Sequence, residues 1–351
     1  MRVALLTYST KPRGGVVHTL NLAEALADAG AEVTLWTLGR GGDRGFFRPV
    51  RAGVRVEVVP FAARESEGVG PRILRSIEVL RAAFDPAGYD IVHAQDCISA
   101  NAVGRCVRTI HHLDTFSTPE LVRCHERAVV EPYARICVSR AVADEVRAGW
   151  GFTPTVIPNG VEYERFAAAA PDRRLGRYVL AVGGIEPRKG SIDLLEAFAR
   201  MPAGPRLVFA GGETLFDYRA YRAEFDRRAA ELGVEPLVLG PVPHDELPGL
   251  VAGAEVLGFL STKEGFGLAA MEALAAGVPV VARELPVLRE VFGDAVTYAR
   301  DVAEAAVLLA QEPSPERRAA GRALARGYDW AAAAAAHLAF YRELTPVAGP
   351  M

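Results

Sequence analysis

Hydrophobic residues along the chain form short continuous runs that alternate with segments of helical periodicity. The first such unit is a strand at Val3–Thr7, a helix at Val16–Ala29 and a strand at Glu32–Leu38. A strand–helix–strand order predicts a parallel sheet covered by helices, which is an α/β fold. The same pattern predicts further strands over Val54–Val59, Ile91–Ala94, Val107–Ile110 and Ile136–Val138.

The alternation begins again in the second half of the chain. Tyr178 opens a buried strand that runs into Gly183-Gly184, and a short strand is predicted over Ala254–Leu260. The segment Phe166–Arg177 mixes alanines, a proline and charges, which is typical of a linker. Since 351 residues suffice for two cores, we expect domains at 1–166 and 178–330, joined by a linker at 167–177.

Composition excludes several classes of protein. The formal net charge of −3 gives no reason to expect a nucleic-acid partner. No apolar run reaches the ~18–20 residues that span a membrane. The N-terminal segment reads as a strand rather than a signal peptide, and the four cysteines lack metal-like Cys-x-x-Cys spacing. We therefore expect a cytoplasmic protein with free thiols.

One stretch, Thr262–Ala282, combines the features of an anion site. Gly265 and Gly267 permit a sharp turn of the backbone. A run of good helix formers is predicted as a helix from about Phe266 to Ala276. This helix follows the strand Ala254–Leu260. Its N-terminus favours an anion, because the first-turn N–H groups of a helix are unpaired and the helix dipole is positive at that end. We expect a diphosphate to bind the N–H groups of Phe266, Gly267 and Leu268.

Two carboxylates, Glu264 and Glu272, flank this predicted site. A carboxylate directly against a diphosphate would repel it, whereas one placed to either side can accept hydrogen bonds from sugar hydroxyls. A sugar nucleotide has that layout, with a hexose, a diphosphate and a ribose. The alternative is a helix whose two glutamates are simply solvated.

Cations are predicted on a second glycine-containing loop. Arg188 and Lys189 follow Gly183-Gly184 at the start of a helix, and Lys263 precedes the first glutamate. Two cations and a helix N-terminus can together neutralise a diphosphate. A solvated Pro-Arg-Lys turn would have the same local sequence.

These motifs resemble those of retaining glycosyltransferase family 4. Glu264 and Glu272, within EGFGLAAMEALAAGVPVVA, resemble the donor-binding Glu-x7-Glu signature of that family. Pro187-Arg-Lys-Gly190 is similar to its Pro-x-Lys-Gly, and Thr109-Ile-His111 to its Thr-x-His. The resemblance implies the GT-B architecture, in which two Rossmann-like domains face each other across a cleft. It also implies that a helix at about 331–345 packs back on the first domain.

The resemblance assigns roles to individual residues. His111 would contact the donor sugar, and the loop containing Gly15 would reach the cleft. The implied catalytic residues are His111, Glu264, Lys189 and Arg188. The implied donor-binding residues are Gly15, Gly184, Gly212, Lys263, Phe266, Gly267, Leu268 and Glu272. Gly184 departs from the family pattern, because many members have arginine there, and Arg188 is a candidate replacement.

Other residues at strand ends are candidates for the acceptor side. His112 and Asp114 follow the predicted strand Val107–Ile110, and Asp96 follows Ile91–Ala94. Loops at the carboxyl ends of parallel strands are where open α/β sheets bind ligands. The helix predicted over Pro71–Phe84 is amphipathic. It is interpreted as packing on the core, with peripheral contact to anionic lipid as the alternative.

We expect an enzyme that transfers a sugar from a nucleotide-diphosphate sugar to an acceptor, with retention at the anomeric carbon by a front-face route. A non-hydrolysing sugar-nucleotide epimerase and a non-catalytic sugar-nucleotide-binding protein are the alternatives. A nicotinamide dehydrogenase is disfavoured because Gly-x-Gly-x-x-Gly is absent. We expect no required cofactor and no metal site, with Mg²⁺ assistance left open. Base, sugar, acceptor and oligomeric state are not determined by the sequence.

Overall fold

The structure is a computed structural model that describes residues 1–116, 118–202, 204–212, 218–312 and 314–344. The chain divides into two compact units, each described separately below. Unit 1 comprises Met1–Gly160 and the chain from Trp330 onward, and unit 2 comprises Val161–Asp329. Unit 1 is therefore built from two separate stretches of sequence.

The boundary between the units differs from the expected one at residue 166. The chain enters unit 2 after Gly160, and α6 (Tyr163–Ala167) packs against α9 and α10 of that unit. The segment expected to be a linker thus begins inside a helix of unit 2. The C-terminal helix α14 (Trp330–Leu344) lies in unit 1, beside α1 (Gly14–Asp28).

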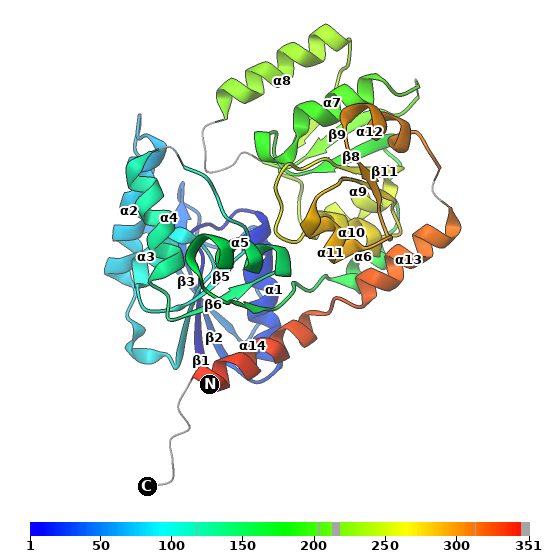
Figure 1. Cartoon of the computed structure of the whole chain (residues 1–351). Helices are drawn as coiled ribbons and strands as arrows, with labels where there is room; N and C mark the ends of the chain where they lie inside the picture. Colours follow the sequence, from blue (N-terminus) through cyan, green and yellow to red (C-terminus); the bar gives the residue numbers. More distant parts are fainter. Residues whose placement is uncertain (117, 203, 213–217, 313, 345–351) are drawn as a thin grey trace. The chain divides into compact units, whose positions relative to one another are not determined.

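The described residues of unit 1 form a seven-stranded parallel sheet of order β3-β2-β1-β4-β5-β6-β7. Its apolar core gathers inward residues of the strands with those of α1 and α14, which lie side by side (Figure 1). The strands are β1 (Arg2–Leu6), β2 (Glu32–Arg40), β3 (Val54–Phe61), β4 (Ile91–Ala94), β5 (Val107–Ile110), β6 (Ala134–Cys137) and β7 (Thr155–Val156).

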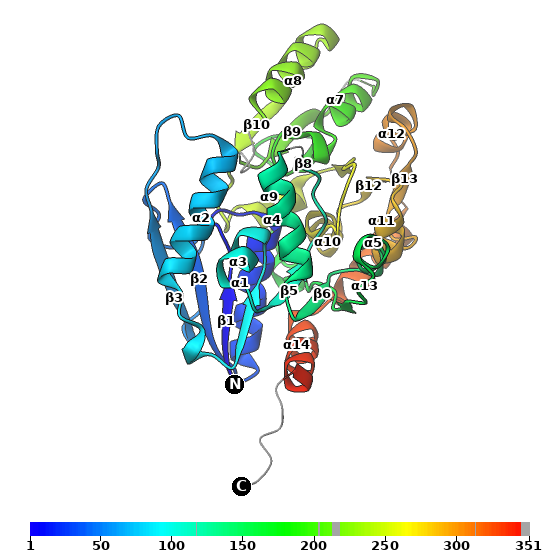
Figure 2. The same ribbon diagram turned by 60° about the vertical axis from the view of Figure 1, so that its left-hand side comes forward.

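The remaining helices of unit 1 follow the strands in turn, and α2, α3 and α4 pack in series (Figure 2). These helices are α2 (Val69–Ala83), the 3-10 turn η1 (Pro86–Gly88), α3 (Cys97–Val103), α4 (Pro119–Val130) and α5 (Arg140–Trp150). Ser139 caps α5 by accepting a 3.3 Å hydrogen bond from Val142 N, as its position before a helical run predicts.

The described residues of unit 2 form a six-stranded parallel sheet of order β10-β9-β8-β11-β12-β13. The strands are β8 (Tyr178–Val182), β9 (Arg206–Ala210), β10 (Leu237–Gly240), β11 (Val256–Phe259), β12 (Val280–Arg283) and β13 (Thr297–Ala299). Besides α6, the helices are η2 (Pro187–Lys189), α7 (Ser191–Ala199), α8 (Arg219–Leu232), α9 (Leu247–Gly253), α10 (Leu268–Ala275), α11 (Pro286–Phe292), α12 (Val302–Leu309) and α13 (Pro315–Arg326).

Each sheet reverses its strand order next to its first strand. The reversal lies between β1 and β4 in unit 1 and between β8 and β11 in unit 2. Open α/β sheets bind ligands at the carboxyl ends of the strands at such a point. In unit 2, the loops there are those that carry the predicted cations and the predicted diphosphate site. The expected α/β fold with two Rossmann-like sheets is confirmed.

Candidate active site

Two loops of unit 2, one after β8 and one after β11, are joined backbone to backbone. Thr262 N donates a 2.8 Å hydrogen bond to Arg188 O. Gly190 has φ 61°, and a Cβ there would lie 2.1 Å from Leu260 O. Only glycine fits such a contact, so Gly190 allows the loop of the cations to approach the loop of the first glutamate.

This approach brings Glu264 together with both predicted cations. Its Oε1 lies 2.6 Å from Lys189 Nζ and 3.4 Å from Arg188 Nη1. Arg188 also donates a 3.2 Å bond to Lys263 O and a 3.2 Å bond to Glu186 Oε1. Sequence reasoning missed Glu186, although a carboxylate two residues before an arginine was a visible signal.

The Glu264 carboxylate stays ionised in this setting. Burial by itself would raise its pKa, but the charges of Lys189 and then Arg188 outweigh burial and lower the pKa to about 2. Its side chain is only 9% exposed. Glu264 therefore serves as a fixed anion that holds two cations at the end of β8.

The N-terminus of α10 begins after a glycine. Gly267, its N-cap, has φ 96° and provides no side-chain cap. A Cβ at Gly267 would lie 3.0 Å from Phe292 Cε2, a tight contact that adds to the conformational preference for glycine. Leu268 begins the helix, and the Phe266 ring is buried against Tyr328 with 5.3 Å between ring centroids. The Phe266 side chain therefore belongs to the core, and only backbone groups of this turn are available to bind an anion.

Glu272 lies within α10 near α6, an element that sequence reasoning did not connect with the site. Its pKa is raised to about 8, first by burial and then by the Glu162 charge, while Arg165 opposes the shift in part. Arg165 in turn pairs with Glu162 at 2.9 Å. The signal that could have revealed this neighbour was the charged start of α6, which lies outside both recognised motifs.

Gly184 and Gly212 occupy the loops that follow β8 and β9. The two loops are packed tightly, because a Cβ at Gly211 would lie 2.2 Å from the carbonyl carbon of Gly183. A Cβ at Gly212 would lie 2.9 Å from Pro241 Cγ. Position 184 is a glycine, so no arginine is present there. The arginine that reaches Glu264 is Arg188, three residues after Ile185 in the chain.

In unit 1, His111 and Gly15 lie together. His111 directly follows β5, and a Cβ at Gly15 would lie 3.5 Å from its Cδ2 and 3.7 Å from its Nε2. Burial, and next the neighbouring His18, lower the pKa of His111 well below its ordinary value, so the imidazole is neutral. The expected loop position of Gly15 is wrong, because α1 begins at Gly14 and Gly15 lies in its first turn.

The residues expected on the acceptor side lie in different settings. His112 Nε2 lies 3.1 Å from Asp114 Oδ1, so these two side chains form a pair. Asp96 caps α3 instead of facing a ligand. Its Oδ1 accepts from Ser99 N at 2.8 Å, and its Oδ2 accepts from Tyr8 N at 2.9 Å and from Ser99 Oγ at 3.0 Å. Three hydrogen bonds inside unit 1 thus hold Asp96 in its capping position.

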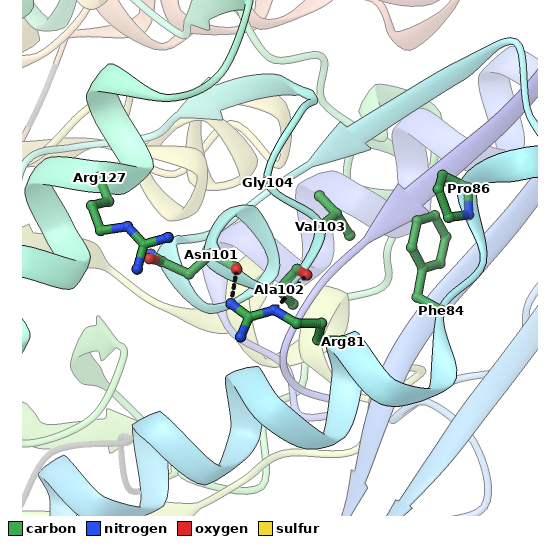
Figure 3. Close-up of a pocket in the computed structure, with 8 residues that line it drawn as sticks. All are labelled: Arg81, Phe84, Pro86, Asn101, Ala102, Val103, Gly104 and Arg127. Carbon is green, nitrogen blue, oxygen red and sulfur yellow. Dashed lines mark hydrogen bonds between the residues drawn. The ribbon is translucent and has the colours of Figure 1, made fainter.

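Two arginines of α2, Arg75 and Arg81, have partners within unit 1. Arg75 forms a bidentate pair with Glu67 at 2.7 and 2.5 Å. Arg81 donates to Asn101 O at 2.6 Å and to Ala102 O at 3.3 Å (Figure 3). Arg81 lines an open pocket of about 470 Å³ together with Phe84, Pro86, Asn101, Ala102, Val103, Gly104 and Arg127 (Figure 3). None of the predicted site residues lines this pocket. These contacts favour the core-packed interpretation of α2.

Three further observations concern the described part of the chain. None of its helices combines the length and the apolar character needed to cross a bilayer. Its His, Cys, Asp and Glu side chains form no group of three suited to a metal ion. Cys97, Cys106, Cys124 and Cys137 are free thiols.

Comparison with known proteins identifies the family. The family described as Glycosyltransferase Family 4 matches residues 12–165, and the family described as Glycosyl transferases group 1 matches residues 166–316. A D-inositol 3-phosphate glycosyltransferase of Xylanimonas cellulosilytica is 30% identical over 98% of this chain and 97% of its own length. A phosphatidyl-myo-inositol mannosyltransferase of Mycolicibacterium smegmatis is 28% identical over 98% of this chain and 94% of its own.

Solved structures share the fold at lower identity. Anabaena HepE in complex with UDP and glucose has a TM-score of 0.71 at 19% identity, covering 98% of this chain and 100% of that one. Sucrose-phosphate synthase from Thermosynechococcus elongatus has a TM-score of 0.78 at 18% identity, covering 98% and 99%. With two matching family halves, a relative at 30% identity over nearly the whole length, and these structural neighbours, the chain belongs to the family 4 glycosyltransferases of GT-B fold.

Proposed function

We propose that this glycosyltransferase uses a nucleoside-diphosphate sugar as donor and that unit 2 binds the diphosphate at the N-terminus of α10. The observation that carries the proposal is the convergence of Lys189 and Arg188 on Glu264, on the loops that flank this uncapped helix end. The charges of Lys189 and Arg188 are balanced by those of Glu264 and Glu186. The backbone N–H groups of α10 and the Lys263 ammonium must therefore supply much of the attraction for the diphosphate.

Catalysis in this proposal rests on stabilising the leaving nucleoside diphosphate. Lys189 and Arg188 would donate charge-assisted hydrogen bonds to the departing phosphate, each worth roughly 1.5–3 kcal/mol. Glu264 keeps these cations in place. A carboxylate accepts about four hydrogen bonds, so Glu264 retains capacity to accept one from a hydroxyl of the donor sugar.

Retention would follow from a front-face route. The acceptor hydroxyl attacks the anomeric carbon from the side of the leaving group, and the departing phosphate takes the acceptor proton. His111 would donate or accept a hydrogen bond as a neutral imidazole on the sugar side. Glu272 would meet the ribose hydroxyls, where its raised pKa makes the protonated form available as well as the carboxylate.

The printed names of similar proteins suggest the first substrates to test. HepE was crystallised with UDP and glucose, and other solved neighbours carry UDP-sugars, so UDP-glucose is a first donor. Two relatives are named for inositol-containing acceptors, so D-inositol 3-phosphate and phosphatidyl-myo-inositol are first acceptors. We propose that the transfer needs no resident cofactor, which activity in the presence of EDTA would support.

The decisive experiment has two stages. A thermal-shift panel of nucleoside diphosphates and sugar nucleotides selects the donor, because binding to the folded state raises apparent stability. Transfer to acceptor is then followed by NMR of the product, with a retained anomeric configuration expected. Inverted product would exclude the front-face route. Epimerised donor in the absence of acceptor would favour the epimerase alternative, and binding without turnover of any acceptor would favour a sensor.

A further inference from the structure

Four of the chain's seven histidines lie in one group within unit 1. The ring centroids of His18 and His111 are 4.7 Å apart, those of His18 and His337 are 6.4 Å apart, and those of His93 and His337 are 5.8 Å apart. His93 and His337 have clear structural partners. His93 contacts Tyr341 Oη at 2.6 Å and Thr109 Oγ1 at 2.7 Å, and His337 Nδ1 contacts Ala333 O at 2.7 Å. His18 is the member of the group that contacts the candidate active-site histidine.

The ring of His18 is held from three sides. Its Nδ1 lies 2.8 Å from Asn159 Oδ1, and its ring packs at a steep angle on Trp330, 5.3 Å away, and on His111. Only 1% of His18 is exposed. Because Asn159 Oδ1 can only accept, Nδ1 of His18 carries the hydrogen. Both the tautomer and the plane of the His18 ring are therefore defined.

The two segments that hold His18 are themselves locked together. Asn159 precedes Gly160, where the chain leaves unit 1, and Trp330 is where it returns. A Cβ at Gly160 would lie 2.5 Å from Trp330 N, so the two segments touch through a position that only glycine can occupy. His18 thus rests on a support that does not depend on any contact made by His111.

Helix α1 presents both Gly15 and His18 to the same imidazole. Residues i and i+3 lie on one face of a helix. Gly15 places no side chain against the Cδ2–Nε2 edge of His111, and His18 packs against the ring at an interplanar angle of 76°. The buried Nε2 of His111 has no hydrogen-bond partner among the described residues, so its hydrogen-bonding capacity is not used within the described part of the chain. A histidine ring turns broadly about χ2 unless its surroundings restrict it.

We propose that His18 is a positioning residue, whose ring sets the plane of the His111 imidazole so that Nε2 meets the substrate. The inference rests on the proposed role of His111 in sugar transfer. A leucine at position 18 would fill the same space but leave the Asn159 oxygen without a donor. Histidine supplies both the donor and the flat surface against His111.

The test is His18→Asn. The asparagine amide reproduces Nδ1–H, so the bond to Asn159 survives, while the part of the ring that touches His111 is removed. We expect kcat to fall at least tenfold and the KM for the donor to change less than threefold, because the diphosphate is bound in unit 2. His337→Asn is the matched control. It makes the same change in the same group, also retains a local bond to Ala333 O, and should leave kcat within twofold of wild type.

A second readout does not depend on activity. Nitrogen NMR of histidine-labelled protein reports the tautomer and environment of each imidazole. In His18→Asn, the signals of the His111 ring nitrogens should shift because the ring contact is lost, while His337→Asn should leave them unchanged. Thermal unfolding should show that both variants fold and lose similar stability.

The outcomes separate the two proposals. If His111→Ala remains active, the proposed role of His111 fails, whatever His18 does. If His111→Ala is inactive but His18→Asn retains wild-type kcat and unshifted His111 signals, the positioning inference is overturned. Equal losses of kcat in His18→Asn and His337→Asn would also overturn it, because a general loss of packing would then explain both.

Discussion

Lys189 and Glu264 form a 2.6 Å ion pair although 75 residues separate them in the chain. The pair joins the turn after β8 to the turn after β11, two strands that are neighbours in the sheet of unit 2 through Val179↔Val256. It is therefore a product of sheet order, and it puts a fixed cation and a fixed anion beside the open end of α10.

Removing either member of this pair should impair catalysis. We expect Glu264→Gln and Lys189→Ala each to lower kcat/KM by well over tenfold, a loss of ~1.4 kcal/mol or more in transition-state stabilisation. Steady-state kinetics with the selected donor measures this loss. Glu284→Gln is the control, because Glu284 pairs with Arg289 at 2.7 Å on the surface and should affect kcat/KM less than twofold. Near-normal turnover by both site variants would contradict the assignment.

Glu264 should also make the folded state sensitive to acid. Its folded pKa of about 2 is below the ordinary value of 4.5, so the ionised group stabilises the protein above pH ~4.5. This contribution is lost as the pH falls from 4.5 toward 2. The difference in free energy of unfolding between wild type and Glu264→Gln should therefore shrink over that window in urea titrations. A difference that stays constant from pH 6 to pH 3 would be inconsistent with the lowered pKa.

Glu272 should have the opposite dependence. Its folded pKa of about 8 exceeds 4.5, so its contribution to stability is full below pH ~4.5 and is lost as the pH rises through 8. Relative to Glu272→Gln, the wild type should lose up to about 1.4 kcal/mol per pH unit within this window. Urea titrations of both proteins from pH 5 to pH 9 measure the effect. If the two curves run parallel, Glu272 is not buried beside Glu162 as described.

Gly15→Ala should separate stability from activity. Alanine is the better helix former, so the substitution should leave stability unchanged or raise it by up to about 1 kcal/mol. The new methyl group would lie 3.5 Å from His111 Cδ2 and would cover the edge beside Nε2, so kcat/KM should fall about tenfold. Gly14→Ala is the control in the same helical turn, because no atom lies within 4 Å of its Cβ position. Equal kinetics for the two variants would show that the His111 edge is not used.

Gly160→Ala should destabilise unit 1. The added Cβ would lie 2.5 Å from Trp330 N and 2.6 Å from its ring, and these atoms cannot move without displacing the start of α14. We expect a loss of roughly 2–4 kcal/mol in the free energy of unfolding. Gly149→Ala, in α5 with nothing within 4 Å of its Cβ position, should be neutral or stabilising. Thermal and urea unfolding of the two variants would detect the contrast.

The local signals in the sequence predicted the fold well. Apolar runs and helical periodicity identified most strands of the two sheets, although not β7 or β13, and Ser139 marked the start of α5, because these features depend on residues close together in the chain. The helix expected from Phe266 begins instead at Leu268. The motif residues Glu264, Lys189 and Arg188 were also selected correctly as a group that meets. The sequence was a weaker guide to where single residues lie. Gly15 is in the first turn of α1 rather than in a loop, and Asp96 caps α3 rather than facing a ligand. Unit 1 ends at Gly160 rather than at residue 166.

The sequence by itself determined the alternation of strands and helices, the glycines that permit close backbone contact, and the chemical types of the site. Only the tertiary structure decided the partners: Glu186 for Arg188, Glu162 for Glu272, and His18 for His111. The physical reason is that secondary structure follows from neighbours along the chain. The partner of a buried charge or ring is instead set by which strands the sheet places side by side and which helix then covers them.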